Sequence, residues 1–410
     1  MLPAAIGTCL ALLGDATLYA VLPTHTRDVG VTVASVGILL SANRFIRLAL
    51  NGPAGLIYER WRRRPLFIAS LLLGALSTAI YVLAQGFWLL LAGRLLWGVA
   101  WSGIWVGGNT IVLDVTGDAD RGRWVGLYTL FFFLGAASGS LLGGLLTDGL
   151  GYHGAMAVNA ALTLAGALVA WHWLPETRGR RAQAGSPEAA PVDGPRRRGE
   201  FASALTLLAA HRLAVAGILS STLGIYLLAT VGEQLRVGSL TVGVATLTGL
   251  ALGSNTLIAM VCAPLIGRLS DQMGSRWRTA SVGLAPGVAG FGLLAASLPM
   301  APLLGVPLIA VTSGSSQGLA TTLIGDLGSR GQSRRLGVLF TVGDLASAVG
   351  PPLAYGLMPH LGIRSIYLMV AGLLVGVLVL MWRQAGRAGE CLTEPADEVQ
   401  PAGNVNGCPT

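Results

Sequence analysis

Residues 55–64 read Gly-Leu-Ile-Tyr-Glu-Arg-Trp-Arg-Arg-Arg, and residues 267–276 read Gly-Arg-Leu-Ser-Asp-Gln-Met-Gly-Ser-Arg. The two stretches lie 212 residues apart, and each begins with glycine, has a carboxylate at its fifth position and ends with arginine. At the same offset Asp114 matches Asp326. A repeat at one fixed spacing predicts that the chain contains two copies of one structural unit.

The composition around these stretches excludes the water-soluble classes of protein. The 410 residues are 53% apolar and only 11% charged, with 58 glycines. Soluble domains carry about 25% charged residues, and disordered chains need a high charge content. The glycines show no three-residue period, which excludes collagen. A membrane protein that crosses the bilayer many times is therefore expected.

Apolar segments of membrane-spanning length follow one another through both copies. Segments of this length predict helices, because the strands of membrane barrels are shorter. The first is not expected to be a cleaved signal peptide, since it lacks a basic start and Asp15 interrupts it. The twelve expected spans are residues 3–23, 34–57, 66–85, 88–113, 124–147, 154–174, 212–232, 242–267, 279–298, 302–325, 336–358 and 364–382.

These spans predict an all-α membrane protein of twelve transmembrane helices in two parallel six-helix bundles, residues 1–174 and 211–383. Six spans separate the copies, so both copies have the same topology. The connection 175–210 contains four prolines and is expected to be a flexible cytoplasmic linker. Residues 384–410 are polar and are expected to be a disordered cytoplasmic tail.

The arginines predict the orientation in the membrane. All 27 basic residues are arginine: 21 lie in the even-numbered connections and the tail, three lie in the opposite loops, and three lie inside spans. Cytoplasmic loops carry the excess of basic residues, so both termini are expected in the cytoplasm. The net charge of +8 then needs no nucleic-acid partner. The four cysteines form no CxxC pair and indicate neither a disulfide framework nor a metal site.

Several motifs resemble those of the major facilitator superfamily. Residues 55–64 are similar to its loop signature G-x-x-x-D-R-x-G-R-R, with Glu59 in place of Asp and Arg62 in place of Gly. The second copy keeps Asp271 and Gly274. Further similarities lie in Leu13-Gly14-Asp15…Leu22-Pro23, in Arg94-Leu-Leu-Trp-Gly98 and in Leu174-Pro175-Glu176-Thr177-Arg178.

The fifth span also resembles a motif of this family, the glycine pattern of its antiporters, with Ser140 at a position that is usually proline. Glycines at intervals of four share a helix face and let another backbone approach closely. The resemblance implies a bending or sealing helix, and ordinary helix packing is the alternative. The glycines concerned are Gly126, Gly135, Gly139, Gly143 and Gly144.

The resemblance implies that the bundles enclose a cavity lined by the first, fourth, seventh and tenth spans, and that they rock to open it on alternate sides. It also implies that the loop signatures form a conformational latch. Asp114 ends the fourth span on the same side of the membrane and is a plausible partner for Arg63. A topology anchor alone is the alternative. The latch residues are Gly55, Glu59, Arg60, Arg63, Arg64, Asp114, Gly267, Asp271 and Arg276.

Charges inside the spans are costly and should be paired or face a cavity. The depths of Asp15, Arg44 and Arg47 predict an ion pair between Asp15 and one of the two arginines. Asp15 is a candidate for proton coupling with Arg44 and Arg47, and a static pair that orients two helices is the alternative. Asp344, in the eleventh span, is a second candidate for proton binding.

A stripe of aromatic residues follows Arg94 along the fourth span, at Trp97, Trp101 and Trp105. If the stripe faces the cavity, it offers a cation and aromatic faces to an amphipathic ligand. Packing inside the bundle is the alternative. The residues expected to line the substrate cavity are Tyr19, Arg94, Trp101, Trp105 and Gln317.

The histidines lie at span ends or in loops, and no nucleophile, phosphate loop or metal motif is in context, so no enzyme and no cofactor are expected. The expected function is proton-coupled efflux of a small amphipathic compound by a monomeric antiporter of the plasma (inner) membrane, through alternating access. Its expected partners are the substrate, protons and the lipid bilayer. The alternatives are uptake or uniport of a metabolite by the same fold, and a non-transporting sensor or assembly protein.

Overall fold

The computed structural model describes residues 1–117, 120–178, 195–296, 298, 301–327 and 332–393. Within them, ten helical segments are long and apolar enough to cross a bilayer. The elements are α1 (Leu2–Val21), α2 (Val33–Arg60), α3 (Arg63–Leu83), α4 (Phe87–Val115), α5 (Arg121–Trp173), α6 (Pro195–His211), the π-helix η1 (Arg212–Leu219), α7 (Ser220–Val231), β1 (Gln234–Val237), β2 (Leu240–Gly243), α8 (Val244–Met273), α9 (Arg276–Ala296), α10 (Ala301–Asp326) and α11 (Gln332–Thr393).

The expected helical fold is confirmed, and its internal repeat is visible in the helices. The helices α3 and α9 have 21 residues each, and α5 and α11 begin 211 residues apart. Both of these long helices contain one non-helical glycine, Gly151 with φ 76° and Gly362 with φ 72°. Only glycine adopts this backbone region readily, so the chain turns back at the same place in both halves. Each long helix covers two of the expected spans.

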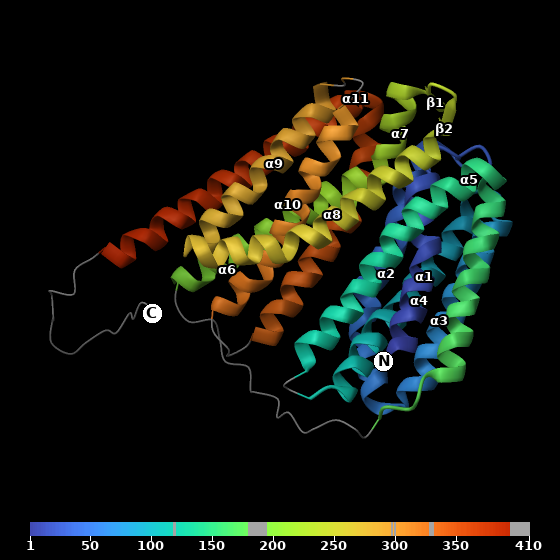
Figure 1. Cartoon of the computed structure of the whole chain (residues 1–410), viewed down its shortest axis with the longest axis horizontal. Helices are drawn as coiled ribbons and strands as arrows, with labels where there is room; N and C mark the ends of the chain where they lie inside the picture. Colours follow the sequence, from blue (N-terminus) through green and yellow to red (C-terminus); the bar gives the residue numbers. More distant parts are fainter. Residues whose placement is uncertain (118–119, 179–194, 297, 299–300, 328–331, 394–410) are drawn as a thin grey trace.

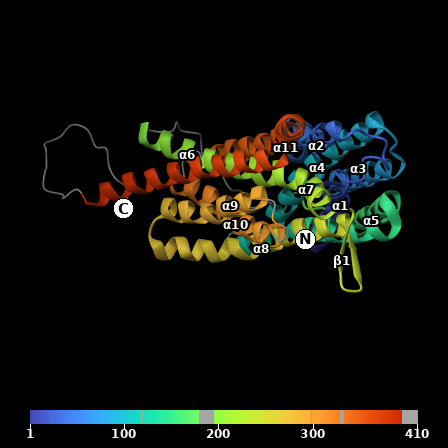
Figure 2. The ribbon, with the colours of Figure 1, turned by 90° about the horizontal axis from the view of Figure 1, so that it is seen from above.

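Figure 1 places the helices α1–α5 of the first half beside α8–α11 of the second half. The turns of α5 and α11 lie at the same end of the molecule as the β1–β2 hairpin, which we call the hairpin end. The N-terminus and the start of α6 lie toward the opposite end. The hairpin is the exception to an all-helical fold; it is antiparallel, turns at Gly238 with φ 64°, and projects away from the helices in Figure 2.

Two expected boundaries differ from the structure. Residues 195–210 were expected within the linker but form α6, because Leu207 and Leu208 are buried in the second bundle. Proline at the start of this helix suits a position that needs no N–H donor. The helix α11 likewise continues past the expected start of the tail to Thr393. The rest of the expected linker, 179–194, and of the tail, 394–410, lies outside the described residues.

The glycine-rich face of α5 predicted from the sequence packs against α1. A Cβ at Gly139 would lie 2.8 Å from the backbone oxygen of Leu13, and one at Gly135 would lie 2.9 Å from the Cα of Cys9. The Thr17 hydroxyl donates to the Gly139 carbonyl at 2.8 Å, across the same contact. The close approach expected at this face is therefore confirmed, although Gly126 has no neighbour at its Cβ position.

Candidate functional site

A buried ion pair joins α1 to α4 in the first bundle. Arg94 is fully buried, and one terminal nitrogen of its guanidinium pairs with Asp15, whose side chain is 17% exposed. Its other nitrogens donate to the carbonyl oxygens of Leu39 at 3.0 Å and Leu40 at 3.2 Å, both in α2. The Tyr19 hydroxyl donates to the same Leu40 carbonyl at 2.7 Å. The buried guanidinium of Arg94 therefore holds α1, α2 and α4 together. We call this group of residues the Asp15–Arg94 centre.

The prediction that Asp15 pairs with Arg44 or Arg47 is wrong. Neither arginine bonds to Asp15, and both reach across to the second bundle. Arg44 donates to the Ser347 carbonyl at 2.6 Å, and Arg47 pairs with Asp344 at 3.1 Å. The spacing along α2 correctly placed Arg44 and Arg47 at about the depth of Asp15 in the bilayer. The rotation of α2 about its own axis, however, directs both arginines toward α11.

The aromatic stripe of α4 is a stack, as its spacing predicts, but it is largely buried. The ring centroids of Trp97 and Trp101 lie 5.9 Å apart, and those of Trp101 and Trp105 lie 6.0 Å apart. Trp101 is 4% exposed, whereas Trp105 is partly exposed and packs on Phe132. In this conformation the packing alternative describes most of the stripe. Tyr19 and Arg94, also expected in the cavity, are buried in the Asp15–Arg94 centre.

The first copy of the loop signature forms a buried network at the end opposite the hairpin. Arg63 Nε lies 3.1 Å from Asp114 Oδ2, as the sequence predicted, and both side chains are buried. The hydroxyl of Thr177 donates to the same carboxylate oxygen at 3.2 Å. Arg64 donates to the Trp171 carbonyl at 2.6 Å. Gly55 has no neighbour at its Cβ position, and Glu59 and Arg60 are exposed.

Glu176 completes this network, although no role was expected for it from the sequence. It accepts hydrogen bonds from the backbone N–H groups of Arg63 at 2.9 Å and Arg64 at 3.4 Å, the free donors at the start of α3. Partial burial acts to raise the pKa of Glu176, but N–H donation from Arg178, Arg63, Arg64 and Thr177 outweighs it and lowers that pKa below its usual value. Its position two residues after the expected sixth span was the available signal.

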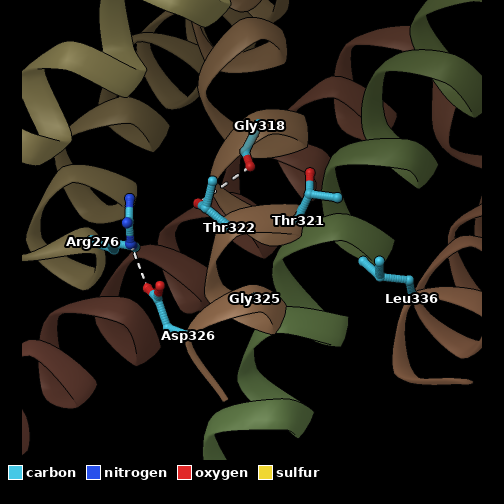
Figure 3. A pocket seen from close by; sticks show the side chains of 7 residues that line it. All are labelled: Arg276, Gly318, Thr321, Thr322, Gly325, Asp326 and Leu336. Carbon is cyan, nitrogen blue, oxygen red and sulfur yellow. Dashed lines mark hydrogen bonds and ion pairs between the residues drawn. The ribbon is translucent and has the colours of Figure 1, made fainter. Parts of the chain in front are cut away.

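The second copy is more open. Arg276 pairs with Asp326 and also lies 3.5 Å from Asp271, whose side chain is 71% exposed. Gly267 has no neighbour at its Cβ position. A pocket of about 430 Å³ adjoins this pair, lined mainly by α10 (Figure 3). Gln317 is not among its lining residues, so the pocket is not the substrate cavity expected from the sequence. The lining residues are Arg276, Gly318, Thr321, Thr322, Gly325, Asp326 and Leu336.

The two bundles meet between the middle of the helices and the hairpin end. The helix α5 contacts α8 at Gly144, where a Cβ would collide with the Ala245 carbonyl. Asp148 accepts a hydrogen bond from the backbone N–H of Thr246 at 2.9 Å. The helix α2 contacts α11 at Gly37, where a Cβ would lie 2.8 Å from the Pro351 carbonyl oxygen.

Comparison with known proteins decides the family. The sequence model described as Major Facilitator Superfamily matches residues 4–252 and 213–404. The chain belongs to the major facilitator superfamily. This family consists of transporters, so the facilitator is a membrane-embedded transporter of a small molecule and not an enzyme, as expected.

The relatives of this facilitator include resistance proteins. It is 27% identical over 368 residues to the class G tetracycline resistance protein of Vibrio anguillarum, which covers 88% of this chain and 89% of that protein. It is 31% identical over 169 residues to the inner membrane transport protein YnfM of Escherichia coli, 40% of each chain. A crystal structure of a bacterial homolog to the human lysosomal transporter Spinster has the same fold, with TM-score 0.77 at 16% identity over 94% of this chain and 96% of that one.

Proposed function

We propose that this facilitator is a proton-coupled antiporter that exports a small amphipathic compound by alternating access. The Asp15–Arg94 centre carries the proposal. A proton that binds Asp15 cancels the charge that balances a fully buried arginine, so protonation changes what holds α1, α2 and α4 together. Relatives named for tetracycline resistance favour export over uptake, since export is how a transporter protects a cell.

We further propose twelve transmembrane crossings with both termini in the cytoplasm. At 1.5 Å per residue, the 53 residues of α5 would extend about 80 Å, whereas the hydrocarbon core is about 30 Å thick. Two crossings in α5 and two in α11, divided at Gly151 and Gly362, turn the ten segments into twelve. The hairpin end then faces outward, and the contacts between the bundles close the outer side. The transporter works as a monomer in the plasma (inner) membrane.

The orientation is tested by cysteine labelling in intact cells. With the four native cysteines replaced by serine, a cysteine at Glu200 should resist a membrane-impermeant maleimide, because α6 begins on the cytoplasmic side. A cysteine at Arg236, in the hairpin, is the matched control and should react. Labelling at position 200 from outside would reverse the proposed topology.

The loop network is proposed to act as a conformational latch, because it ties the ends of α3, α4 and α5 together far from the Asp15–Arg94 centre. Arg63→Ala should lower the transport rate and leave substrate affinity nearly unchanged. It should also lower the free energy of unfolding by about 3–5 kcal/mol, because Asp114 loses its buried partner. Binding and initial transport rates are measured on purified protein that remains folded.

Arg62→Ala is the control for this substitution, since Arg62 is the exposed neighbour of Arg63 and has no hydrogen-bond partner among the described residues. It should transport normally. If Arg63→Ala weakens binding but cycles at the normal rate, the network serves the substrate site and is not a latch.

One other mode of transport is compatible with this fold, because uniport would use the same bundles without a proton. The decisive experiment is transport in proteoliposomes with an imposed pH difference, against a compound panel that begins with tetracycline. Accumulation that collapses with the pH gradient supports antiport. Equilibration without accumulation indicates uniport.

A further inference from the structure

Three arginines lie near one carboxylate, Asp344, where α2 meets η1 and α11. Arg47 pairs with Asp344 at 3.1 Å, and Arg44 donates to the Ser347 carbonyl at 2.6 Å. Arg212, the first residue of η1, lies within electrostatic range of Asp344 and of both other arginines. Its Cγ lies beside Gly343, the residue before Asp344. We call Arg44, Arg47, Arg212 and Asp344 the arginine cluster.

The charges of the arginine cluster do not balance. Arginine stays protonated in proteins, so three positive charges face one carboxylate. Arg44 is bonded to a neutral carbonyl and lies over the neutral ring of Tyr19, 4.9 Å from the ring centroid, and Arg212 has no hydrogen-bond partner among the described residues. The Nε atoms of Arg212 and Arg47 are buried and unpartnered. Charge held inside a membrane protein normally has a counter-charge, and this cluster lacks two.

The side chains of the arginine cluster are partly exposed, so they are accessible to a ligand. The side chains of Arg47 and Asp344 are 19% and 20% exposed, and Arg212 is also partly exposed. The π-helix adds a second indication, because such segments are rare and often occur at functional sites, and this one begins at Arg212.

The cluster is not part of the scaffold that the two halves share. At the repeat offset of 212, Arg44 corresponds to Thr256 and Arg47 corresponds to Ala259. The fold is therefore built in the second copy without these charges. The cluster also joins the two bundles, so a ligand bound there contacts both moving parts of the transporter.

We infer that the arginine cluster binds the anionic group of the transported compound: a carboxylate, sulfonate or phosphate. This inference deepens the proposed function and rests on it. Guanidinium groups present paired N–H donors that match the oxygens of such groups, and their charge here is uncompensated. Asp344 occupies one position of the cluster, so an incoming anion competes with it for Arg47. The substrate class is then an amphipathic organic anion.

Three naphthalene probes of nearly equal shape test the charge requirement: 2-naphthoate, its neutral amide 2-naphthamide, and the cationic 2-naphthylmethylamine. Binding is measured by calorimetry on the purified full chain in detergent. We expect 2-naphthoate to bind at least tenfold more tightly than the other two, since charge-assisted hydrogen bonds are lost with the anion. Equal affinity for the amide would overturn the inference.

Two substitutions should move the affinity in opposite directions. Arg212→Gln should weaken 2-naphthoate binding about ten- to hundredfold, because it removes a positive charge that would hydrogen-bond to the carboxylate of the ligand. Asp344→Asn should strengthen it several-fold, because a competing carboxylate is removed. Arg364→Gln, at an exposed arginine of the outer side, is the control and should have no effect. A purely structural role of Asp344 would not make 2-naphthoate bind more tightly to Asp344→Asn. If this variant shows no gain in affinity, the proposed anion site is contradicted.

An anionic lipid could present the same chemistry through its headgroup. Phosphatidylglycerol is therefore added to the detergent sample. If 2-naphthoate still binds, the cluster serves a soluble organic anion; if the lipid blocks binding and stays with the protein on purification, the substrate assignment is wrong. These measurements need no pH gradient. If proton-driven transport fails, the 2-naphthoate binding results still stand. If the binding tests fail, the proposal of proton-coupled export still stands.

Discussion

Replacing Asp15 with asparagine should abolish transport driven by a pH gradient while the purified protein still binds its substrate. Asparagine keeps the size and hydrogen-bonding geometry of the side chain but cannot gain or lose a proton in the cycle. Proton-coupled exchange requires the proton to bind on one side and leave on the other. Substrate binding by this variant should also lose the dependence on pH that proton binding at Asp15 would give it.

The same substitution should destabilise the first bundle. Arg94 is fully buried and would keep its charge without Asp15, with only carbonyl and hydroxyl oxygens around it. Removing one partner of a buried pair costs about 3–5 kcal/mol of unfolding free energy. The double variant Asp15→Asn with Arg94→Gln removes both charges, so it should recover much of that stability. It should not recover coupled transport, and this separates the two roles of Asp15.

Asp28→Asn is the control, because Asp28 is an exposed carboxylate in the loop after α1. It should behave as the unmodified protein does in unfolding and in proteoliposome transport. If Asp15→Asn still accumulates substrate against its gradient when a pH difference is imposed, then Asp15 is structural. The coupling role would then pass to Asp344, or proton coupling would have to be abandoned.

The features predicted correctly from the sequence are those fixed by position along one helix or by the repeat. Arg63 and Asp114 lie at neighbouring helix ends on one side of the membrane, so their pairing followed from topology alone. The glycine face of α5 followed from its four-residue period. The turns at Gly151 and Gly362 occupy equivalent positions in the two copies, although only the structure shows that they need positive φ.

The features that the sequence did not reveal depend on rotation of helices about their axes and on the conformation of the whole transporter. Asp15 and Arg44 lie at depths in the bilayer that would allow them to pair. Because of the rotation of the helices about their axes, however, Asp15 pairs with Arg94, and Arg44 bonds to α11. Rotation also buries Trp101. The contacts across α2–α11 and α5–α8 join residues from different bundles, which would separate in the proposed alternation. No period or motif in either copy predicts them.

Gly249→Ala should slow transport about five- to hundredfold by preventing closure of the bundles at the hairpin end. Gly249 lies in α8 against α5, and a Cβ there would collide with the backbone carbonyl of Ser140. A backbone carbonyl cannot move aside as a side chain can, so the helices have to separate. Overpacking of this kind costs about 1–3 kcal/mol, and each 1.4 kcal/mol shifts a population about tenfold.

Alanine is chosen because intrinsic helix propensity opposes the expected result. In a helix interior alanine is favoured over glycine by about 1 kcal/mol, so Gly249→Ala would stabilise α8 if nothing faced it. Gly292→Ala, in α9, is the matched control, because no atom lies within 4 Å of its Cβ position. It should transport normally and unfold at the same or a slightly higher temperature. Equal losses in both variants would show that the helix, not the contact, is responsible.

The position of the defect can be read from a cysteine at Ala245. Ala245 is fully buried and lies against Gly144 in the same α5–α8 contact. In a background without native cysteines, a maleimide added from outside should label this cysteine faster in Gly249→Ala than in the parent, because the variant spends more time open at the hairpin end. Slow transport with unchanged labelling would mean that the α5–α8 contact does not close the outer side. The proposed alternation between two closures would then need a different pair of helices.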